Sequence, residues 1–100
     1  MCTCSVTIIP VGKGTSMSDV LSKSIQVLDE FEDVKHQITP MSTQLEGPTE
    51  RIMQAIQAMH EAAFESGVDR VYTTIVLDER RDKDLSLEER VEHVKQKVPA

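Results

Sequence analysis

The chain has 100 residues, 39% hydrophobic and 28% charged, with a formal net charge of −6. This length fits one domain, 1–100, of ordinary globular composition. An acidic chain with 3% aromatic residues is a poor ligand for nucleic acid, because phosphates are bound by basic residues and bases stack on aromatic rings. Since the sequence has neither a membrane-spanning apolar run nor a secretion signal, we expect a cytoplasmic protein without membrane partners.

The first half of the chain shows the patterns of strand, helix, strand and strand. Residues 4–9 alternate between apolar and polar as in a half-buried strand. An apolar stripe at helical spacing then predicts a helix of about 14 residues that begins near Ser16 or Ser18. Two further strands are predicted at 34–39 and 42–46, joined as a hairpin.

The second half continues with helix, strand and helix. A helix is predicted to open at Thr49 or the adjacent Pro48 and to end at Gly67, followed by a strongly β-forming strand at 70–77. A charged loop at 78–84 precedes a last helix near Ser86. This order predicts an α+β fold, the ferredoxin-like βαββαβ sandwich with an extra C-terminal helix. Both main helices then cover one face of a four-stranded antiparallel sheet whose first and third strands are central.

The other face of this sheet must meet water or a partner. Its predicted residues mix hydroxyls, amides and apolar groups: Ser5, Thr7, Ile9, Lys35, Gln37, Thr39, Gln44, Glu46, Tyr72, Thr74 and Val76. Such a mixture suits a wet protein–protein interface. Because closed symmetric assemblies are common, we expect a homo-oligomer, in which the last helix could pack against its own domain or against a neighbour.

Two segments could contact an anion, although a structural role explains each of them better. The segment 12–14 with Ser16 has the composition of a phosphate loop but lacks the Walker spacing, so turn chemistry is the better interpretation. The hydroxyls of Ser16 and Ser18 could still contact a ligand. The alternating charges of 80–84 could clamp an anion, but such charges more often pair with one another at the surface.

The cysteines and histidines form no recognisable catalytic or metal-binding pattern. Cys2 and Cys4 are too close in sequence for a useful disulfide and are expected to be reduced thiols. Together with His36, His60 and His93 they lack the spacing of zinc ligands. His60 fits a neutral histidine with one core hydrogen bond better than a base for Cys4. We therefore predict no metal, no cofactor and no catalytic residue.

Glu46 is the most informative acidic residue of the chain. It stands at the end of a predicted central strand, and we expect Thr43 nearby and Thr39 across the hairpin. A carboxylate in this place could accept hydrogen bonds from an amino-heterocycle or balance a cation. The alternative is a surface acid at a strand end, which position alone favours equally.

Five segments of the chain, together and in the same order, resemble the thiamine-binding YkoF/MTH1187-like family of UPF0045-type proteins. They are Val-Thr-Ile-Ile-Pro-Val-Gly at 6–12, Thr-Pro-Met-Ser-Thr at 39–43, Leu-Glu-Gly at 45–47, His-Glu-Ala-Ala-Phe-Glu-Ser-Gly at 60–67 and Asp-Glu-Arg-Arg-Asp-Lys at 78–83. The resemblance covers nearly the whole chain, with a departure at Ser42, where the family often has glycine. It implies a ferredoxin-like fold, dimers or tetramers, and binding of thiamine or its hydroxymethylpyrimidine moiety without any reaction.

A ligand of this kind combines an aminopyrimidine with a positively charged thiazolium, which hydroxyls, a carboxylate and an apolar slot would satisfy. The polar candidates are Ser16, Ser18, Thr39, Thr43 and Glu46, and the apolar candidates are Ile9, Met41 and Leu45. The leading hypothesis is therefore a non-enzymatic binder of a small molecule. The alternative is an oligomerising structural or protein-interaction module without such a ligand. A small enzyme is disfavoured by the lack of a catalytic constellation.

Overall fold

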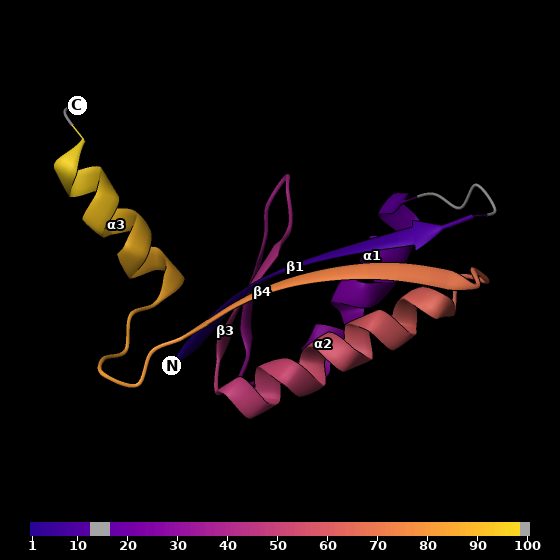
Figure 1. Cartoon of the computed structure of the whole chain (residues 1–100), viewed down its shortest axis with the longest axis horizontal. Coiled ribbons are helices and arrows are strands. Elements are labelled where there is room, and N and C mark those ends of the chain that lie inside the picture. Colours follow the sequence, from indigo (N-terminus) through magenta and orange to yellow (C-terminus); the bar gives the residue numbers. More distant parts are fainter. Residues whose placement is uncertain (13–16, 99–100) are drawn as a thin grey trace.

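The computed structural model describes residues 1–12 and 17–98, and its strands form one antiparallel sheet (Figure 1). The strands are β1 (Cys2–Val11), β2 (Lys35–Ile38), β3 (Thr43–Gly47) and β4 (Arg70–Glu79), in the order β2-β3-β1-β4. The helices are α1 (Met17–Gln26), which the 3₁₀ helix η1 (Val27–Glu30) continues, α2 (Thr49–Phe64) and α3 (Leu87–Lys97). This arrangement confirms the predicted ferredoxin-like α+β fold with β1 and β3 in the centre.

One face of the sheet forms the hydrophobic core with α1 and α2. Alternation along β1 directs Cys4, Val6 and Ile8 towards these helices, and all three are buried. Leu45 of β3 and Met59 of α2 pack into the same core. Each such aliphatic side chain contributes roughly 1.5–3 kcal/mol by leaving water, so an aliphatic core compensates for the scarcity of aromatic residues.

The strand register confirms the predicted division of side chains between the two faces. Cys4 lies opposite Leu45 on the helix-covered face, whereas Ser5 lies opposite Gln44 and Val76 on the open face. Opposite residues in a sheet point to the same side, so the alternation read from one strand fixes the faces of its neighbours.

Several element boundaries differ from those predicted, beginning with β1, which spans Cys2–Val11 rather than 4–9. Helix α1 is a regular α-helix only to Gln26. The next four residues form a 3₁₀ turn, which is a common way for a helix to end. The second strand begins at Lys35 rather than one residue earlier. β4 continues through Asp78 and Glu79, which were expected in a loop, because the partner strand β1 extends to the start of the chain and pairs with them.

Helix α3 stands away from the sheet and has no buried residue (Figure 1). It touches the domain at its first turn, where the N–H of Leu87 donates to Oε2 of Glu46 at 2.8 Å and Arg90 pairs with Asp78 at 2.9 Å. The predicted valine stripe of this helix is exposed to solvent. No helix among the described residues has the length and apolar character needed to cross a bilayer.

Candidate functional site

A cavity of about 180 Å³ lies between the β2–β3 turn and helix α1. Three of the predicted ligand-binding residues, Thr39, Met41 and Thr43, contribute to its wall. The apolar part of the wall includes Leu21 and Ile25 from α1. The structure therefore brings three of the eight candidate ligand residues together, in a hollow with both hydroxyl and aliphatic groups.

Hydrogen bonds hold the β2–β3 turn in one shape. The hydroxyl of Thr39 donates to the carbonyl of Ser42 at 2.7 Å and accepts from its N–H at 3.1 Å. The hydroxyl of Ser42 in turn accepts from Ser5 on β1 and from Gln44 on β3, each at 2.8 Å. Ser42, the departure from the family pattern, thus links the turn to two strands, and the turn is pre-organised to present its neighbours.

The remaining residues around this turn differ in accessibility. Thr43 is buried at the start of β3, whereas the side chain of Met41 is 86% exposed at the tip of the turn. Ser18 is exposed in the first turn of α1, and Ser16 lies outside the described residues. An exposed methionine beside a small cavity is able to cover a ligand without loss of existing packing, because its side chain is unbranched and flexible.

Glu46 is at the opposite end of β3 and has a different environment. It lies opposite Thr3 and Lys35 on the open face and is only 8% exposed. Its carboxylate accepts the N–H of Leu87, an unpaired group of the first helical turn. The expectation that Thr43 lies nearby is wrong, because alternation directs Thr43 to the helix-covered face. The predicted polar residues consequently do not form one site within a chain.

The cap on α3 combines Glu46 with a second group that the sequence could reveal. The hydroxyl of Ser86 accepts the N–H of Glu89 at 3.1 Å, as expected for a serine that precedes a helix. The contribution of Glu46 has no sequence signal, because 41 residues separate it from the N–H that it accepts. A hollow of about 580 Å³ beside it is lined by four acidic residues, Asp33, Glu46, Asp84 and Glu89, by Lys35, and by Met1, whose N-terminal ammonium pairs with Asp84.

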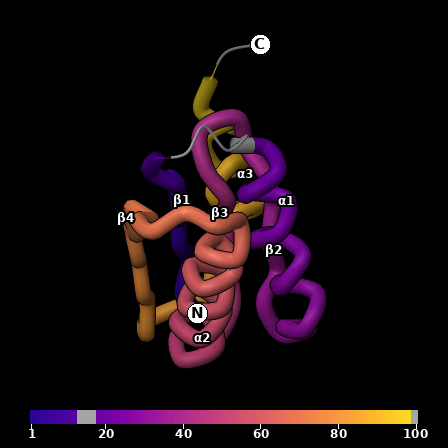
Figure 2. Tube along the Cα trace, turned by 90° about the vertical axis from the view of Figure 1, so that its right-hand side faces the viewer, coloured from indigo at the N-terminus to yellow at the C-terminus, as the bar shows by residue number. Residues whose placement is uncertain are grey.

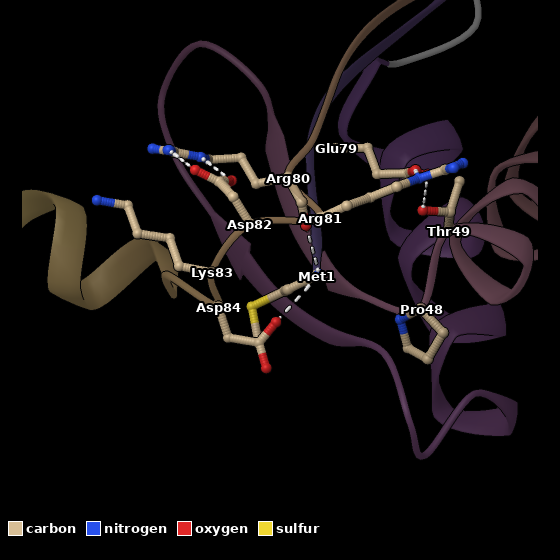
Figure 3. A pocket seen from close by; sticks show the side chains of 9 residues that line it. All are labelled: Met1, Pro48, Thr49, Glu79, Arg80, Arg81, Asp82, Lys83 and Asp84. Carbon is tan, nitrogen blue, oxygen red and sulfur yellow. Dashed lines mark hydrogen bonds and ion pairs between the residues drawn. The ribbon is translucent and has the colours of Figure 1, made fainter.

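The charged loop after β4 forms a polar hollow of about 450 Å³ in which most of the charged groups are paired (Figure 3). Arg80 pairs with Asp82, and Arg81 with Glu79, which also accepts from the hydroxyl of Thr49. The hydrogen bonds from Arg80 lower the pKa of Asp82 to about 2, and those from Thr49 and Arg81 lower the pKa of Glu79. The prediction that the charges of 80–84 pair with one another is confirmed for Arg80 and Asp82, whereas Arg81 pairs outside this segment, with Glu79 at the end of β4.

Neither Cys4 nor His60 is arranged for catalysis. Burial, reinforced by the neighbouring Cys2, raises the pKa of the Cys4 thiol to about 11, so it stays protonated at neutral pH and is a poor nucleophile. His60 is held by a 2.7 Å hydrogen bond between Nδ1 and the hydroxyl of Thr73, and its ring packs edge-on against Phe64. Over residues 1–12 and 17–98, no three His, Cys, Asp or Glu side chains are placed to hold a metal ion.

The sheet order, the two covering helices and the turn-side cavity define a small α+β protein of the ferredoxin-like fold. Residues 4–95 match the model of a family described as thiamine-binding protein. The chain belongs to this family. The UPF0045 protein of Methanothermobacter thermautotrophicus is 40% identical over 100 residues, which cover 98% of this chain and 100% of that protein. The UPF0045 protein YqgV of Bacillus subtilis is 41% identical over 98 residues, with 94% of each chain covered.

Solved structures show the same fold. The crystal structure of MJ1052 from Methanocaldococcus jannaschii superposes with a TM-score of 0.84 at 34% identity, and covers 95% of this chain and 96% of its own. A Thermotoga maritima protein provisionally assigned to thiamine biosynthesis or salvage superposes with a TM-score of 0.78. At 19% identity, over 93% of this chain and 97% of that one, it supports the fold alone.

Proposed function

We propose that this protein binds thiamine or its hydroxymethylpyrimidine moiety without transforming it, in the cytoplasm and as a homo-oligomer, a dimer or a tetramer. The observation that carries the proposal is the cavity at the β2–β3 turn, in a chain whose residues 4–95 match the thiamine-binding family. Aliphatic walls with a few fixed hydroxyls are what a small heterocycle needs, because its ring is apolar and its edge groups require hydrogen-bond partners.

The size of the cavity indicates how much of the ligand one chain encloses. Its volume of about 180 Å³ is below the roughly 300–1,000 Å³ typical of pockets that enclose a drug-sized ligand. We therefore assign to it one ring, the aminopyrimidine, packed between Leu21 and Ile25 with its edge towards Thr43.

Isothermal titration calorimetry with thiamine and with hydroxymethylpyrimidine, each titrated separately, tests the proposal. We expect saturable micromolar binding, about −8 kcal/mol, with hydroxymethylpyrimidine retaining most of the affinity of thiamine. Thr43→Val keeps the side-chain shape but removes the hydroxyl and should weaken binding about tenfold, as the loss of one buried hydrogen bond does. Thr49→Val, at the start of α2 and outside the cavity wall, is the matched control and should bind like wild type.

Glu46 can be tested separately, because its carboxylate already has a structural partner in the N–H of Leu87. If Glu46 also binds the ligand, Glu46→Ala lowers the affinity measured by calorimetry while the domain remains folded. Unchanged affinity, with a weakened attachment of α3, would remove Glu46 from the site and leave it as a helix cap.

The second candidate function is an oligomerising structural or protein-interaction module without a small ligand. It is favoured by the apolar side chains that the open face and helix α3 leave exposed, among them Tyr72, Val76 and Val94. Absence of heat with both compounds, together with no ligand-induced rise in melting temperature, would favour this module over the binder.

A further inference from the structure

Helix α3 carries an apolar stripe that is exposed to solvent. Leu87, Val91 and Val94 follow one another at helical spacing, and Val98 continues the series directly after the last turn. The three valines are between 52% and 61% exposed. Apolar residues at this spacing form the face by which a helix packs on its protein, so the valine stripe (87, 91, 94 and 98) has the pattern of a packing face without the packing.

Two polar contacts join α3 to the strands, and both are made by its first turn. The N–H of Leu87 donates to Glu46, and Arg90 pairs with Asp78. These two carboxylates belong to one row across the open face, because Thr3 lies opposite both of them. The free N–H groups of a helix point along its axis, so the bond to Glu46 holds α3 with its end on this row. The helix then stands clear of the strands (Figure 1), at the end of the sheet opposite to the one that faces the viewer in Figure 2.

Helix α3 has the local interactions of a helix that can move as one unit. Ser86 caps it by accepting the N–H of Glu89, and serine followed three residues later by glutamate is the capping-box pattern. Acidic residues in its first turn and lysines in its last turn match the helix dipole. These interactions are all internal, so they persist when α3 changes its position.

The open face beside α3 presents an apolar strip of matching kind. Val76 and Tyr72 of β4 are 64% and 55% exposed, and Ile9 of β1 is 40% exposed. Ile9 lies opposite Tyr72, so the strip runs along the neighbouring strands β1 and β4, away from the row that holds α3. The valine stripe and this strip are therefore two exposed apolar surfaces of one chain that meet at the first turn of α3.

We propose that α3 is a lid, which swings about its first turn and lays the valine stripe on the open face of its own sheet. The described position of α3 is the open one. In the closed position the helix lies along β1 and β4 and covers the apolar strip. This device is independent of any ligand and goes beyond the proposed function.

The dimensions of the two surfaces agree. With a rise of about 1.5 Å per helical residue, Val91 and Val98 lie about 6 and 16 Å from the start of α3. With about 3.3 Å per strand residue, Val76 and Tyr72 lie about 7 and 20 Å from Asp78. A helix that pivots at the row therefore places its first valine near Val76 and its last near Tyr72.

The helix already has the rotation that closure requires. Leu87 and Arg90 are half-buried, whereas the other residues of α3 are exposed. Leu87 is the first member of the valine stripe, so the side of α3 that touches the sheet is the side that carries the valines. A change of tilt closes the lid, and no turn of the helix about its own axis is needed.

The two positions exchange one kind of contact for another. The open position keeps the bond to Glu46 and the ion pair of Arg90 with Asp78, whose side chains are 33% and 52% exposed. Such exposed pairs contribute little to stability. The closed position removes apolar side chains from water on both surfaces. Loss of the ion pair should therefore shift the population towards the closed lid.

Disulfide formation within one chain tests the closed position. Thr7 lies on the open face at the centre of β1, and the closed lid brings Val94 over it. Thr7→Cys combined with Val94→Cys should form an internal disulfide under mild oxidation, which moves the monomer faster on a non-reducing denaturing gel. Thr7→Cys with Gln96→Cys is the matched control, because Gln96 is on the opposite side of the helix. Cys2 and Cys4 are buried, so the wild type should not react.

The anchoring role of the first turn is tested in the same cross-linking variant. Arg90→Gln removes the ion pair with Asp78 and should speed the internal cross-link about threefold. Lys95→Gln removes an equal charge from α3 at a residue that pairs only within the helix, with Glu92, and should leave the rate unchanged. Equal rates for both variants would show that Arg90 does not hold the lid open, and would overturn that part of the proposal.

Tyr72 gives a second measurement without cross-linking, because the chain has one tyrosine and no tryptophan. Val94→Asp should keep the lid open and make the fluorescence of Tyr72 more accessible to acrylamide than in the wild type. The difference should not depend on protein concentration, since the contact is within one chain. Equal quenching of both proteins would overturn the closed position.

Each cross-linking result has a definite meaning. A fast-moving monomer from the Val94 pair, without one from the Gln96 pair, supports the lid. Cross-linking of both pairs at equal rates would show an arm that moves freely without docking, and would overturn the proposal. Disulfide-linked dimers in place of the internal cross-link would mean that the valine stripe meets another copy, and no cross-link of either kind would leave α3 in its open position. Both of these results also refute the lid.

Discussion

The two edges of the sheet differ in length and in chemistry. β2 has four residues, and its backbone is flanked by Lys35, His36 and Gln37, whereas β4 has ten residues with an apolar middle. The short polar edge needs no cover, because a charged and brief strand is a poor template for another chain. The long apolar edge is a good template for another strand, so the two edges of this sheet differ in their tendency to pair.

The difference between the two edges separates two functions of this small protein, ligand binding and self-association. The cavity proposed for the ligand lies beside the turn that ends β2, and the exposed apolar side chains that favour self-association lie along β4. The central strands β1 and β3 connect them. Substitutions at one edge should therefore change one task and leave the other measurable.

The largest effect is expected when a lysine is placed on each edge in turn. Val76 on β4 is 64% exposed and Ile38 on β2 is 63% exposed, so they form a matched pair. Val76→Lys should weaken self-association about a hundredfold or more, because it places a charge among the exposed apolar side chains of β4 in every subunit. Ile38→Lys should leave the oligomer intact. Sedimentation equilibrium measures the oligomeric state of both variants. If Ile38→Lys alone dissociates the oligomer, β2 rather than β4 is the associating edge.

A smaller effect, on folding stability, is expected at Gly47, which anchors the β2 side. Its φ is +154°, and a Cβ atom there would lie 2.7 Å from the carbonyl oxygen of Asp33, in the loop that leads into β2. Gly47→Ala should therefore lower the free energy of unfolding by about 3 kcal/mol. Gly67→Ala, with a positive φ but no atom within 4 Å, should cost about 1 kcal/mol. Urea denaturation compares the two, and equal losses would show that the contact with Asp33 is unimportant.

Between the edges, Cys4 should make stability depend on alkaline pH. Its pKa is raised from 9.0 to about 11 in the folded protein. The folded chain therefore binds more protons than the unfolded chain in this range, so the stabilising contribution is complete below about pH 9 and is lost as pH rises through about 11. Cys4→Ala should flatten this decline relative to wild type in urea denaturation curves at pH 8–11. Parallel declines in both proteins would assign the effect to other groups.

The smallest effect is expected in the loop after β4, where the arginines are already paired. The pKa of Asp82, lowered to about 2, should return towards 3.8 in Arg80→Gln. Because the folded-state pKa is lowered, any contribution of this pair is present above about pH 4 and disappears as pH falls through about 2. NMR titration of the carboxyl group measures the shift, and an unchanged midpoint would show that the pair does not persist in solution. At neutral pH the stability should hardly change, since exposed ion pairs contribute little.

Most of the fold could be predicted because it follows from periodic patterns. Alternation along β1 gave the two faces, and the order of strands and helices gave the sheet topology. The end of β4 could not be predicted, because Asp78 and Glu79 have the composition of a loop and are kept in the strand only by pairing with β1. Local composition does not report where a partner strand ends.

The candidate site, too, could be predicted from the sequence only in part. Thr39, Met41 and Thr43 share a cavity because they are neighbours around one turn, which sequence proximity already indicates. Glu46 does not join them, and the alternation of side chains along β3 was sufficient to separate it from Thr43. Its bond to Leu87 was beyond prediction, since it depends on where α3 meets the sheet.

The short, singly paired β2 has a further consequence for the motions of the molecule. Its four residues pair only with β3, whereas β1 is paired on both sides, so local opening should begin at β2 and amide hydrogen exchange should be fastest there. The turn that closes the cavity is attached to this strand. The wall of the cavity is thus the part of the sheet that opens most often, which gives a small molecule a way in without unfolding of the core.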